Sequence, residues 1–272
     1  MPDAPPLYLQ QDQPEGVPPL ALTGERTLPD VPEENYWYRR HLVVYEWIAE
    51  RVAGRAAAGP DGGAPQKVVD LACGEGYGTA VLSRAASEAV GVDANPEAYE
   101  HARLRYSDGR TRFVRTLVET FDEPCDVLVF LQTIEHVQDP DAILERFRAL
   151  IGPGGEAYVS TPNLLTLAPP GAEKSENPWH VKEYRAGEYR ELLERHFGHV
   201  EILGLYHARK LRLHAWAIEH AGWDRVHKAL RITKPFYDRF TPAIAASDFV
   251  LRSEADGADL DAALDFVAVL RP

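Results

Sequence analysis

Short apolar runs alternate with amphipathic stretches through the middle of this 272-residue chain. The runs lack the polar–apolar alternation of a half-exposed strand, so we expect strands that are buried on both faces. The expected strands are Lys67–Leu71, Ala89–Val92, Thr111–Thr116, Asp126–Leu131 and Ala157–Ser160, and the helices between them are Gly78–Ala86, Pro96–Tyr106 and Pro140–Leu150. This alternation predicts an α/β fold with a doubly wound, Rossmann-like parallel sheet and helices on both faces.

The flanking segments follow other patterns. Residues 1–34 are rich in proline and acidic residues without periodicity, which predicts an extended or disordered N-terminal segment. The spacing of apolar residues over 35–54 predicts an amphipathic lid helix. The pattern from about residue 207 to 246 predicts a helical insertion. The remaining expected elements are the helix Glu188–Phe197 and the strands Val200–Leu203, Ser247–Leu251 and Leu264–Leu270. We therefore expect residues 35–272 to form one domain.

Composition and charge limit the classes of function. Apolar residues make up 45% of the chain, which is enough for a sizeable buried core. The net charge of −13 and the pI of about 5.2 disfavour nucleic acid or a membrane surface as a partner. No apolar run is typical of a signal peptide or a membrane span, and Cys73 and Cys125 suit free thiols in a reducing compartment. We therefore expect a cytoplasmic protein.

A glycine-rich loop after the first buried strand carries the strongest chemical signal. The loop runs from Asp70 to Thr79 and has glycines at 74, 76 and 78. Glycines let a backbone approach a ligand closely, and the helix start offers free N–H groups. Asp93 follows the second strand at the edge of the same crevice, where a carboxylate binds the ribose hydroxyls of an adenosine. A nicotinamide-binding fingerprint would need a third glycine where Thr79 stands.

The loop, Asp93 and the turn Pro153-Gly154-Gly155 resemble the class I S-adenosylmethionine (SAM)-dependent methyltransferases, over roughly residues 67–203 and the last strand. The resemblance implies SAM as cofactor and a seven-stranded sheet whose last hairpin is reversed. The cofactor-binding residues that it implies are Asp70, Ala72, Gly74, Gly76, Asp93, Ala94, Val118, Glu119, Gln132 and, on the lid helix, Tyr38 and Arg40. Many relatives have an acidic or polar residue for the adenine amine after the third strand, where this chain has Leu117-Val118-Glu119. The adenine contact then falls to the Val118 backbone or to Glu119.

The loops after the fourth and fifth strands carry the candidate catalytic residues Glu135, His136 and His180. They resemble two groups of metal-assisted O-methyltransferases, those of ubiquinone biosynthesis and those acting on small-RNA ends. In these groups a Glu-x-x-Glu-His run and a distant histidine hold a divalent cation, which implies Mg²⁺ or Mn²⁺ on Gln132, Glu135, His136 and His180 here. Gln132 replaces the first glutamate, which weakens charge neutralisation. A metal-free histidine base and a purely structural role are the alternatives.

Two segments indicate the chemical class of the acceptor: the helical insertion and one further run of residues. Residues 207–239 mix basic side chains with histidines and aromatics, which suits a sugar or an acidic acceptor, whereas a solvated helix face is the plainer interpretation. The run Asn177–Glu183 resembles a bacterial subgroup that acts on glycans, sugars or specialised metabolites. We therefore expect O-methylation of a sugar or glycan hydroxyl, with a phenol, a quinol or a specialised metabolite as the alternative acceptor. The alternative classes are an NAD(P)-dependent oxidoreductase and a non-catalytic SAM-binding subunit.

Overall fold

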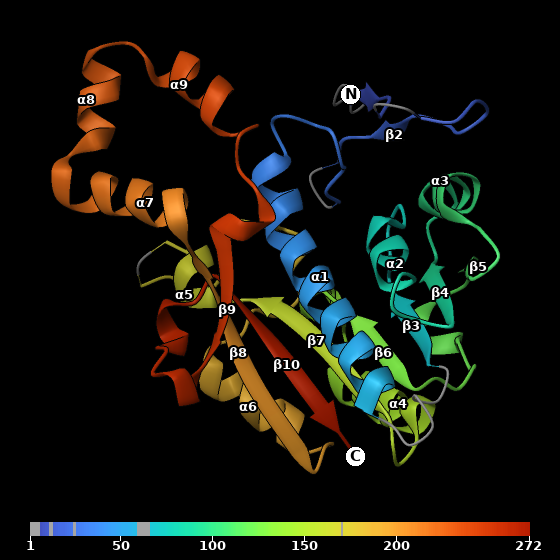
Figure 1. The fold of residues 1–272 in the computed structure, drawn as a ribbon. Helices are drawn as coiled ribbons and strands as arrows, with labels where there is room; N and C mark the ends of the chain where they lie inside the picture. The colour runs from blue at the N-terminus through green and yellow to red at the C-terminus, as the bar shows by residue number, and fades with distance from the viewer. Residues whose placement is uncertain (1–5, 11–12, 24–25, 59–65, 170) are drawn as a thin grey trace.

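An eight-stranded sheet forms the centre of the molecule in the computed structural model, which describes residues 6–10, 13–23, 26–58, 66–169 and 171–272 (Figure 1). The strand order is β5-β4-β3-β6-β7-β10-β8-β9. The bounds in that order are Thr111–Arg115, Glu88–Asp93, Lys67–Leu71, Val127–Phe130, Glu156–Pro162, Asp265–Arg271, His199–His207 and Phe249–Ser253. The first five strands are parallel, and the other three pair antiparallel. The expected α/β class and mostly parallel sheet are confirmed.

The sheet has one strand more than the seven that were expected. The additional strand, β9, pairs with the outer edge of β8 and places Leu251 opposite Leu205. β8 extends to His207, well beyond the expected end at Leu203, and so offers a long edge. Because an unpaired edge leaves backbone N–H and C=O groups without partners, the chain returning from the helical insertion is added to the sheet as a strand.

Helices cover both faces of the sheet. α1 (Asn35–Ala58) and α2 (Tyr77–Leu82) share a buried cluster on one face, while α4 (Pro140–Ile151) and α6 (Ala186–Glu194) share the cluster on the other. Successive strand residues point to opposite faces, so Val68 belongs to the first cluster and Val69 to the second. α3 (Pro96–Tyr106) packs against β5 and β4. Burial on both faces explains why the strands are apolar throughout.

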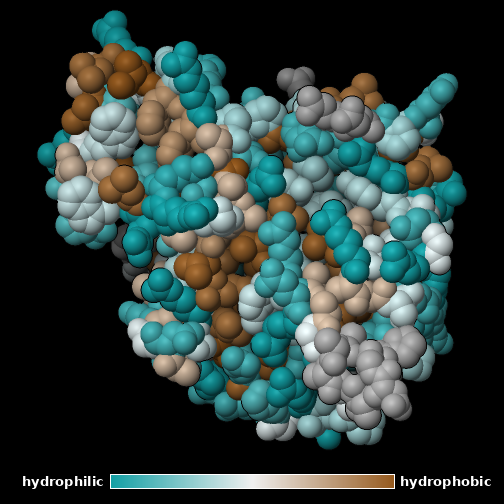
Figure 2. Space-filling view, viewed as in Figure 1, coloured by the Kyte–Doolittle hydropathy of each residue, from teal (hydrophilic) through white to brown (hydrophobic). Residues whose placement is uncertain are grey.

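The helical insertion forms an arm, residues 209–240, that projects from the end of β8 (Figure 1). It consists of α7 (Arg209–Ala221), α8 (Trp223–Ala229) and α9 (Thr233–Phe240). Gly222 adopts φ of +63° between α7 and α8, a conformation that glycine reaches without steric cost. Apolar side chains, brown in Figure 2, are visible on the arm, and its exposed apolar residues include Leu213, Trp216 and Leu230.

The N-terminal segment is packed where it is described. β1 (Leu7–Tyr8) and β2 (Leu20–Ala21) pair antiparallel, and β2 contacts α3. Leu20, Leu28 and Val31 form a small buried cluster. Leu20, Leu28 and Val31 are therefore docked on the domain, while residues 1–5, 11–12 and 24–25 lie outside the described ranges.

Short elements complete the chain. They are α5 (Leu164–Leu167) and the 3-10 turns η2 (Val118–Thr120), η3 (Ile134–His136), η4 (Ala246–Asp248), η5 (Glu254–Asp256) and η6 (Leu260–Ala262). Within the described ranges, none of the helices combines the length and the apolar character that a bilayer span requires.

Candidate active site

Two adjoining cavities open where β3, β4 and β6 end. The glycine-loop cavity, of about 270 Å³, is lined by Gly74, Glu75 and Gln132 among others. The η2 cavity, of about 650 Å³, is lined by Ala94, Val118 and Glu119 among others. Both cavities include Ala72, Asp93, Thr133 and His136 in their walls. The carboxyl edge of a parallel sheet is where α/β proteins bind ligands, so these cavities form the candidate site.

The glycine loop gets its shape from three residues with positive φ. Ala72 has φ of +56°, Gly74 of +57° and Gly76 of +93°. The alanine is the informative one, because a non-glycine residue in this region is strained and such strain collects at functional sites. Gly76 has a different reason: a Cβ there would lie 2.8 Å from the Ala102 Cβ and the Phe113 Cε1. Gly76 therefore lets α2 and the loop pack against α3 and β5.

Asp70, expected to bind the cofactor, lies behind the loop. Its buried carboxylate accepts hydrogen bonds from Thr79 Oγ1 at 2.7 Å and Tyr45 OH at 3.3 Å. Burial raises the pKa of Asp70 to about 7, against the lowering effect of these two hydrogen bonds. Asp70 thus ties the loop to α2 and α1, and it does not appear in the wall of either described cavity.

Asp93 lies at the boundary of the two cavities. Its carboxylate accepts the backbone N–H groups of Gly74 at 2.9 Å and Asn95 at 2.8 Å. Burial raises its pKa, and both backbone hydrogen bonds oppose that shift. The carboxylate therefore fixes the glycine loop as well as facing the crevice.

The two lid-helix residues lie elsewhere. The Arg40 guanidinium is buried and binds Asp265 through Nε at 2.6 Å and Nη2 at 2.5 Å. Tyr38 packs edge-on against the ring of Tyr77, with 5.1 Å between centroids. Neither residue lines either described cavity, and their contacts include Asp265 and Tyr77.

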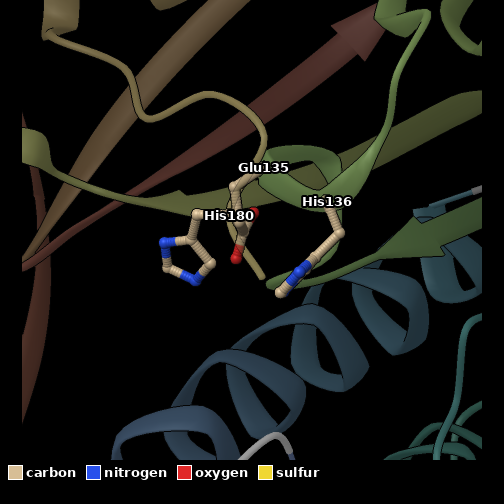
Figure 3. Close-up of side chains that lie close together, drawn as sticks. All are labelled: Glu135, His136 and His180. Carbon is tan, nitrogen blue, oxygen red and sulfur yellow. The ribbon is translucent and has the colours of Figure 1, made fainter. Parts of the chain in front are cut away.

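Glu135, His136 and His180 converge as expected (Figure 3). One ligand atom from each lies within 4.8 Å of the others, and the Glu135 side chain lies between the two imidazole rings. The backbone N–H groups of Val181 and Lys182 donate to the Glu135 carbonyl, at 2.8 and 3.1 Å. These bonds join η3 to the loop that carries His180, which is how residues 45 positions apart in sequence meet.

The His180 ring is oriented by a second carboxylate. Nδ1 lies 2.6 Å from Glu183 Oε1, so Nδ1 donates and the lone pair is on Nε2. Ser175 donates to Glu183 through its backbone N–H at 2.7 Å and through its hydroxyl. An acid that holds one ring nitrogen is the usual support for a histidine that binds a metal or accepts a proton through the other.

Glu135 is a buried acid at the centre of this cluster. Thr161 Oγ1 donates to Oε2 at 3.1 Å. Burial raises the pKa of Glu135 to about 8, because a charged carboxylate loses its water there. A cation beside it would favour the charged form and lower that pKa.

His136 and Gln132 border the cluster. Nδ1 of His136 lies 3.1 Å from the Trp179 carbonyl and, since a carbonyl only accepts, Nδ1 carries the proton. Gln132 has φ of +51°, lines the glycine-loop cavity, and donates through Nε2 to Ser160 Oγ at 3.1 Å. Its position at the cavity fits a cofactor contact, while its amide is already hydrogen-bonded on the side of β7.

Sequence reasoning missed much of the wall of the glycine-loop cavity. The missed polar residues include Arg26, Thr27, His41, Glu75 and Tyr77. Arg26 and Thr27 belong to the aperiodic N-terminal segment, and only the apolar Leu20, Leu28 and Val31 around them could have signalled that this segment docks.

Comparisons with known proteins match most of the chain. Residues 36–228 match a family described as a methyltransferase domain. A protein of Mycolicibacterium smegmatis, named a probable S-adenosylmethionine-dependent methyltransferase, is 36% identical over 263 residues, which cover 93% of this chain and 96% of that protein.

Two further matches are more distant. A ubiquinone biosynthesis O-methyltransferase of Xylella fastidiosa is 32% identical over 117 residues, 39% of this chain and 48% of that protein. The crystal structure of an S-adenosylmethionine-dependent methyltransferase from Mesorhizobium loti has a TM-score of 0.52 at 18% identity, over 84% of this chain and 98% of that one. At this identity the structural match supports the fold alone.

Proposed function

Starting from the fact that this chain belongs to the methyltransferase-domain family and is a SAM-dependent methyltransferase, we propose that it methylates a hydroxyl of a sugar or glycan with help from a divalent cation. SAM supplies an activated methyl group. The enzyme must then hold the acceptor oxygen in line with that methyl and remove its proton. The proposal concerns the second half of this task, at Glu135, His136 and His180. We also propose that residues 35–272 act as one domain with the arm as its insertion.

The two cavities fit SAM. Asp93 at their boundary offers a carboxylate for ribose hydroxyls, and Val118 and Glu119 line the η2 cavity where adenine would lie. The strained loop at Ala72 and Gly74 brings the backbone against the other cavity. The two cavities could therefore hold the two ends of one elongated ligand.

The single observation that carries the proposal is the convergence of one carboxylate and two imidazoles at the edge of the donor site. Glu135, His136 and His180 would bind Mg²⁺ or Mn²⁺. Gln132 lines the adjoining glycine-loop cavity and would support the site through its side-chain oxygen. Such a cation would lower the pKa of a bound hydroxyl and hold it near the donor. Three protein ligands leave coordination positions for the acceptor.

His180 supports proton removal with or without the metal. Its Nε2 lone pair is available because Glu183 holds the Nδ1 proton, and Glu183 would stabilise the imidazolium that forms. A hydroxyl, whose pKa lies far above neutrality, needs such help, whereas an amine is a nucleophile without it. The arrangement therefore favours oxygen as the acceptor atom.

The arm supports a neutral, hydroxyl-rich acceptor. A cavity of about 230 Å³ between α1 and the arm is lined by Tyr36, His207, His214, Tyr237 and Phe240 among others. Burial lowers the pKa of His207 to about 4 and also lowers the pKa of His214, so both rings are neutral at pH 7. Aromatic faces combined with uncharged hydrogen-bonding groups suit a sugar ring. The basic residues of the arm are mostly exposed, which supports a solvated face for them.

A phenol or quinol acceptor is the second candidate. It is favoured by the partial match to a ubiquinone biosynthesis O-methyltransferase, which covers 39% of this chain. A catechol-type acceptor would use the same cation, because two adjacent oxygens can bind one metal.

Titration with S-adenosylhomocysteine (SAH), with and without Mn²⁺, tests the site. We expect SAH to bind, and we expect a separate Mn²⁺ binding heat that is lost in Glu135→Gln and kept in the exposed variant Glu145→Gln. Incubation with labelled SAM and a panel of neutral oligosaccharides and catechols then identifies the acceptor. Labelling of oligosaccharides alone supports the first candidate, and labelling of catechols alone supports the second.

A further inference from the structure

A cation of the N-terminal segment and a buried acid of the glycine loop face the same cavity. Arg26 and Glu75 both line the glycine-loop cavity. The Nη1 atom of Arg26 and the Oε1 atom of Glu75 are buried and have no hydrogen-bond partner among the residues that the structure describes. A buried polar atom without a partner costs free energy, so two such atoms of opposite charge at one cavity point to a ligand between them.

The two residues that follow Arg26 hold it over the loop. Thr27 Oγ1 lies 3.3 Å from His41 Nδ1 on α1 and 3.2 Å from Tyr77 OH at the start of α2. Leu28 is buried in the cluster that anchors the segment. The Arg26 side chain passes directly above the loop, since a Cβ built on Gly74 would lie 3.9 Å from the Arg26 Cδ.

Glu75 is poised to meet a positive group. Its side chain is 2% exposed, and burial raises the pKa of its carboxyl to about 8 while the charge of Arg26 opposes that shift. Arg26 does not satisfy the Oε1 atom. A ligand with an ammonium group would therefore add the partner that this acid lacks.

We propose that Arg26 and Glu75 form a receptor for the amino-acid end of SAM, in which Arg26 binds the α-carboxylate and Glu75 binds the α-ammonium. The arginine fork matches a carboxylate in shape and charge, and a buried glutamate matches an ammonium. The η2 cavity lies on the other side of Asp93 and is left for the adenine. The inference rests on SAM as the cofactor and is independent of the proposed metal and acceptor.

The receptor changes the role of two segments. The carboxylate contact expected from Arg40 on the lid helix passes to Arg26, because Arg40 is already bound to Asp265. Arg26 and Thr27 of the N-terminal segment thereby become part of the cofactor site.

Three nucleosides distinguish the contribution of the α-ammonium group to binding from that of the α-carboxylate. SAH carries both the amine and the carboxylate. S-adenosyl-3-thiopropylamine carries the amine alone, and 5′-methylthioadenosine carries neither. Dissociation constants for all three are measured by calorimetry on the full chain and on four variants: Arg26→Gln, Glu75→Gln and the matched controls Arg103→Gln and Glu100→Gln. The controls remove the members of an exposed ion pair on α3.

The expected pattern is specific. Arg26→Gln weakens SAH about tenfold to a hundredfold, the usual effect of losing a charged hydrogen bond, and leaves the thiopropylamine and methylthioadenosine nearly unchanged. Glu75→Gln weakens SAH and the thiopropylamine and spares methylthioadenosine. The control variants bind all three nucleosides as the wild type does.

Methylthioadenosine also reports folding, because a variant that binds it normally has an intact adenosine site. Two results would contradict the proposed binding of the amino-acid end by Arg26 and Glu75. One is an unchanged SAH affinity in both Arg26→Gln and Glu75→Gln, and the other is an equal loss of affinity for all three nucleosides. Failure of the wild type to bind any nucleoside would overturn SAM dependence itself, which is a distinguishable result.

Discussion

The hydrogen bond from His180 to Glu183 fixes the orientation of the His180 ring. Glu183 holds Nδ1 at 2.6 Å, and the ring lies with its centroid 4.9 Å from that of His136. Replacing His180 by alanine removes Nε2 from the acceptor side and leaves the glycine loop and Asp93 untouched. We expect turnover to fall about 10²- to 10⁴-fold, the range for losing a general base, while SAH affinity stays nearly constant.

Steady-state rates and SAH calorimetry on the same preparations measure this separation. The exposed His199→Ala variant is the control. In Glu183→Gln, turnover should fall about 10- to 100-fold, because the variant weakens the orientation of the His180 ring without removing the ring. Normal turnover in His180→Ala would show that the cluster has no catalytic role.

Asp93 is predicted to behave in the opposite way. Asp93→Ala removes the acceptor for the Gly74 N–H and a wall of both cavities. SAH and methylthioadenosine should both lose at least about tenfold in affinity, because both contain the ribose. Calorimetry on Asp93→Ala beside the exposed control Asp122→Ala decides this, and a loss confined to SAH would assign Asp93 to the amino-acid end instead.

The two arginines show where residue-level prediction from sequence stops. Glu135, His136 and His180 could be predicted because each follows a recognisable buried strand, and strand ends meet at one edge of the sheet. Arg40 was assigned to the cofactor because its helix could be located, but its partner is 225 residues away in sequence. Arg26 lies in an aperiodic segment, so no pattern indicated that it reaches the site.

At the scale of elements, the buried strands could be predicted to within a few residues. β3 and α3 have the expected bounds, because polar residues and turns border each apolar run. β9 was identified as a strand but not as an eighth member of the sheet, since its pairing depends on how far β8 extends. The docking of Leu20, Leu28 and Val31 rests on tertiary contacts, which leave no periodic signal.

Gly76 tests the packing of the glycine loop as an element. Gly76→Ala would place a Cβ 2.8 Å from Ala102 and Phe113 at a residue whose φ is +93°. We expect the free energy of unfolding to fall by about 1–3 kcal/mol, from overpacking together with the strained backbone. Urea unfolding measures it, with Gly109→Ala as the control, since a Cβ there meets nothing within 4 Å. Equal stability of the two variants would contradict this account of the loop.

At the scale of the whole molecule, buried ionisable groups make stability depend on pH. Burial raises the pKa of Glu75 and of Glu135 to about 8 and that of Asp70 to about 7, from ordinary values of 4.5 for the glutamates and 3.8 for the aspartate. Burial lowers the pKa of His41, His101 and His207 to about 4, from 6.5. The acids hold protons that the unfolded chain has released, whereas the histidines lack protons that the unfolded chain holds. The two effects oppose each other as long as the unfolded histidines still hold protons, which is up to about one pH unit above their ordinary pKa.

Between pH 6.5 and 8 the unfolded histidines give up their last protons, and the buried acids outweigh them because their folded-state pKa values lie within this range. The folded state then binds more protons than the unfolded state, and stability falls as pH rises, by about 1.4 kcal/mol per pH unit for each retained proton. We expect urea unfolding of the ligand-free protein, in a chelator, to show a loss of about 2 kcal/mol over this range. Glu75→Gln removes one of these protons and should flatten the slope, while the exposed variant Glu100→Gln should not. A wild-type profile that is flat or rising from pH 6.5 to 8 would mean that these acids are ionised in the folded protein, and that the glycine loop is open to water.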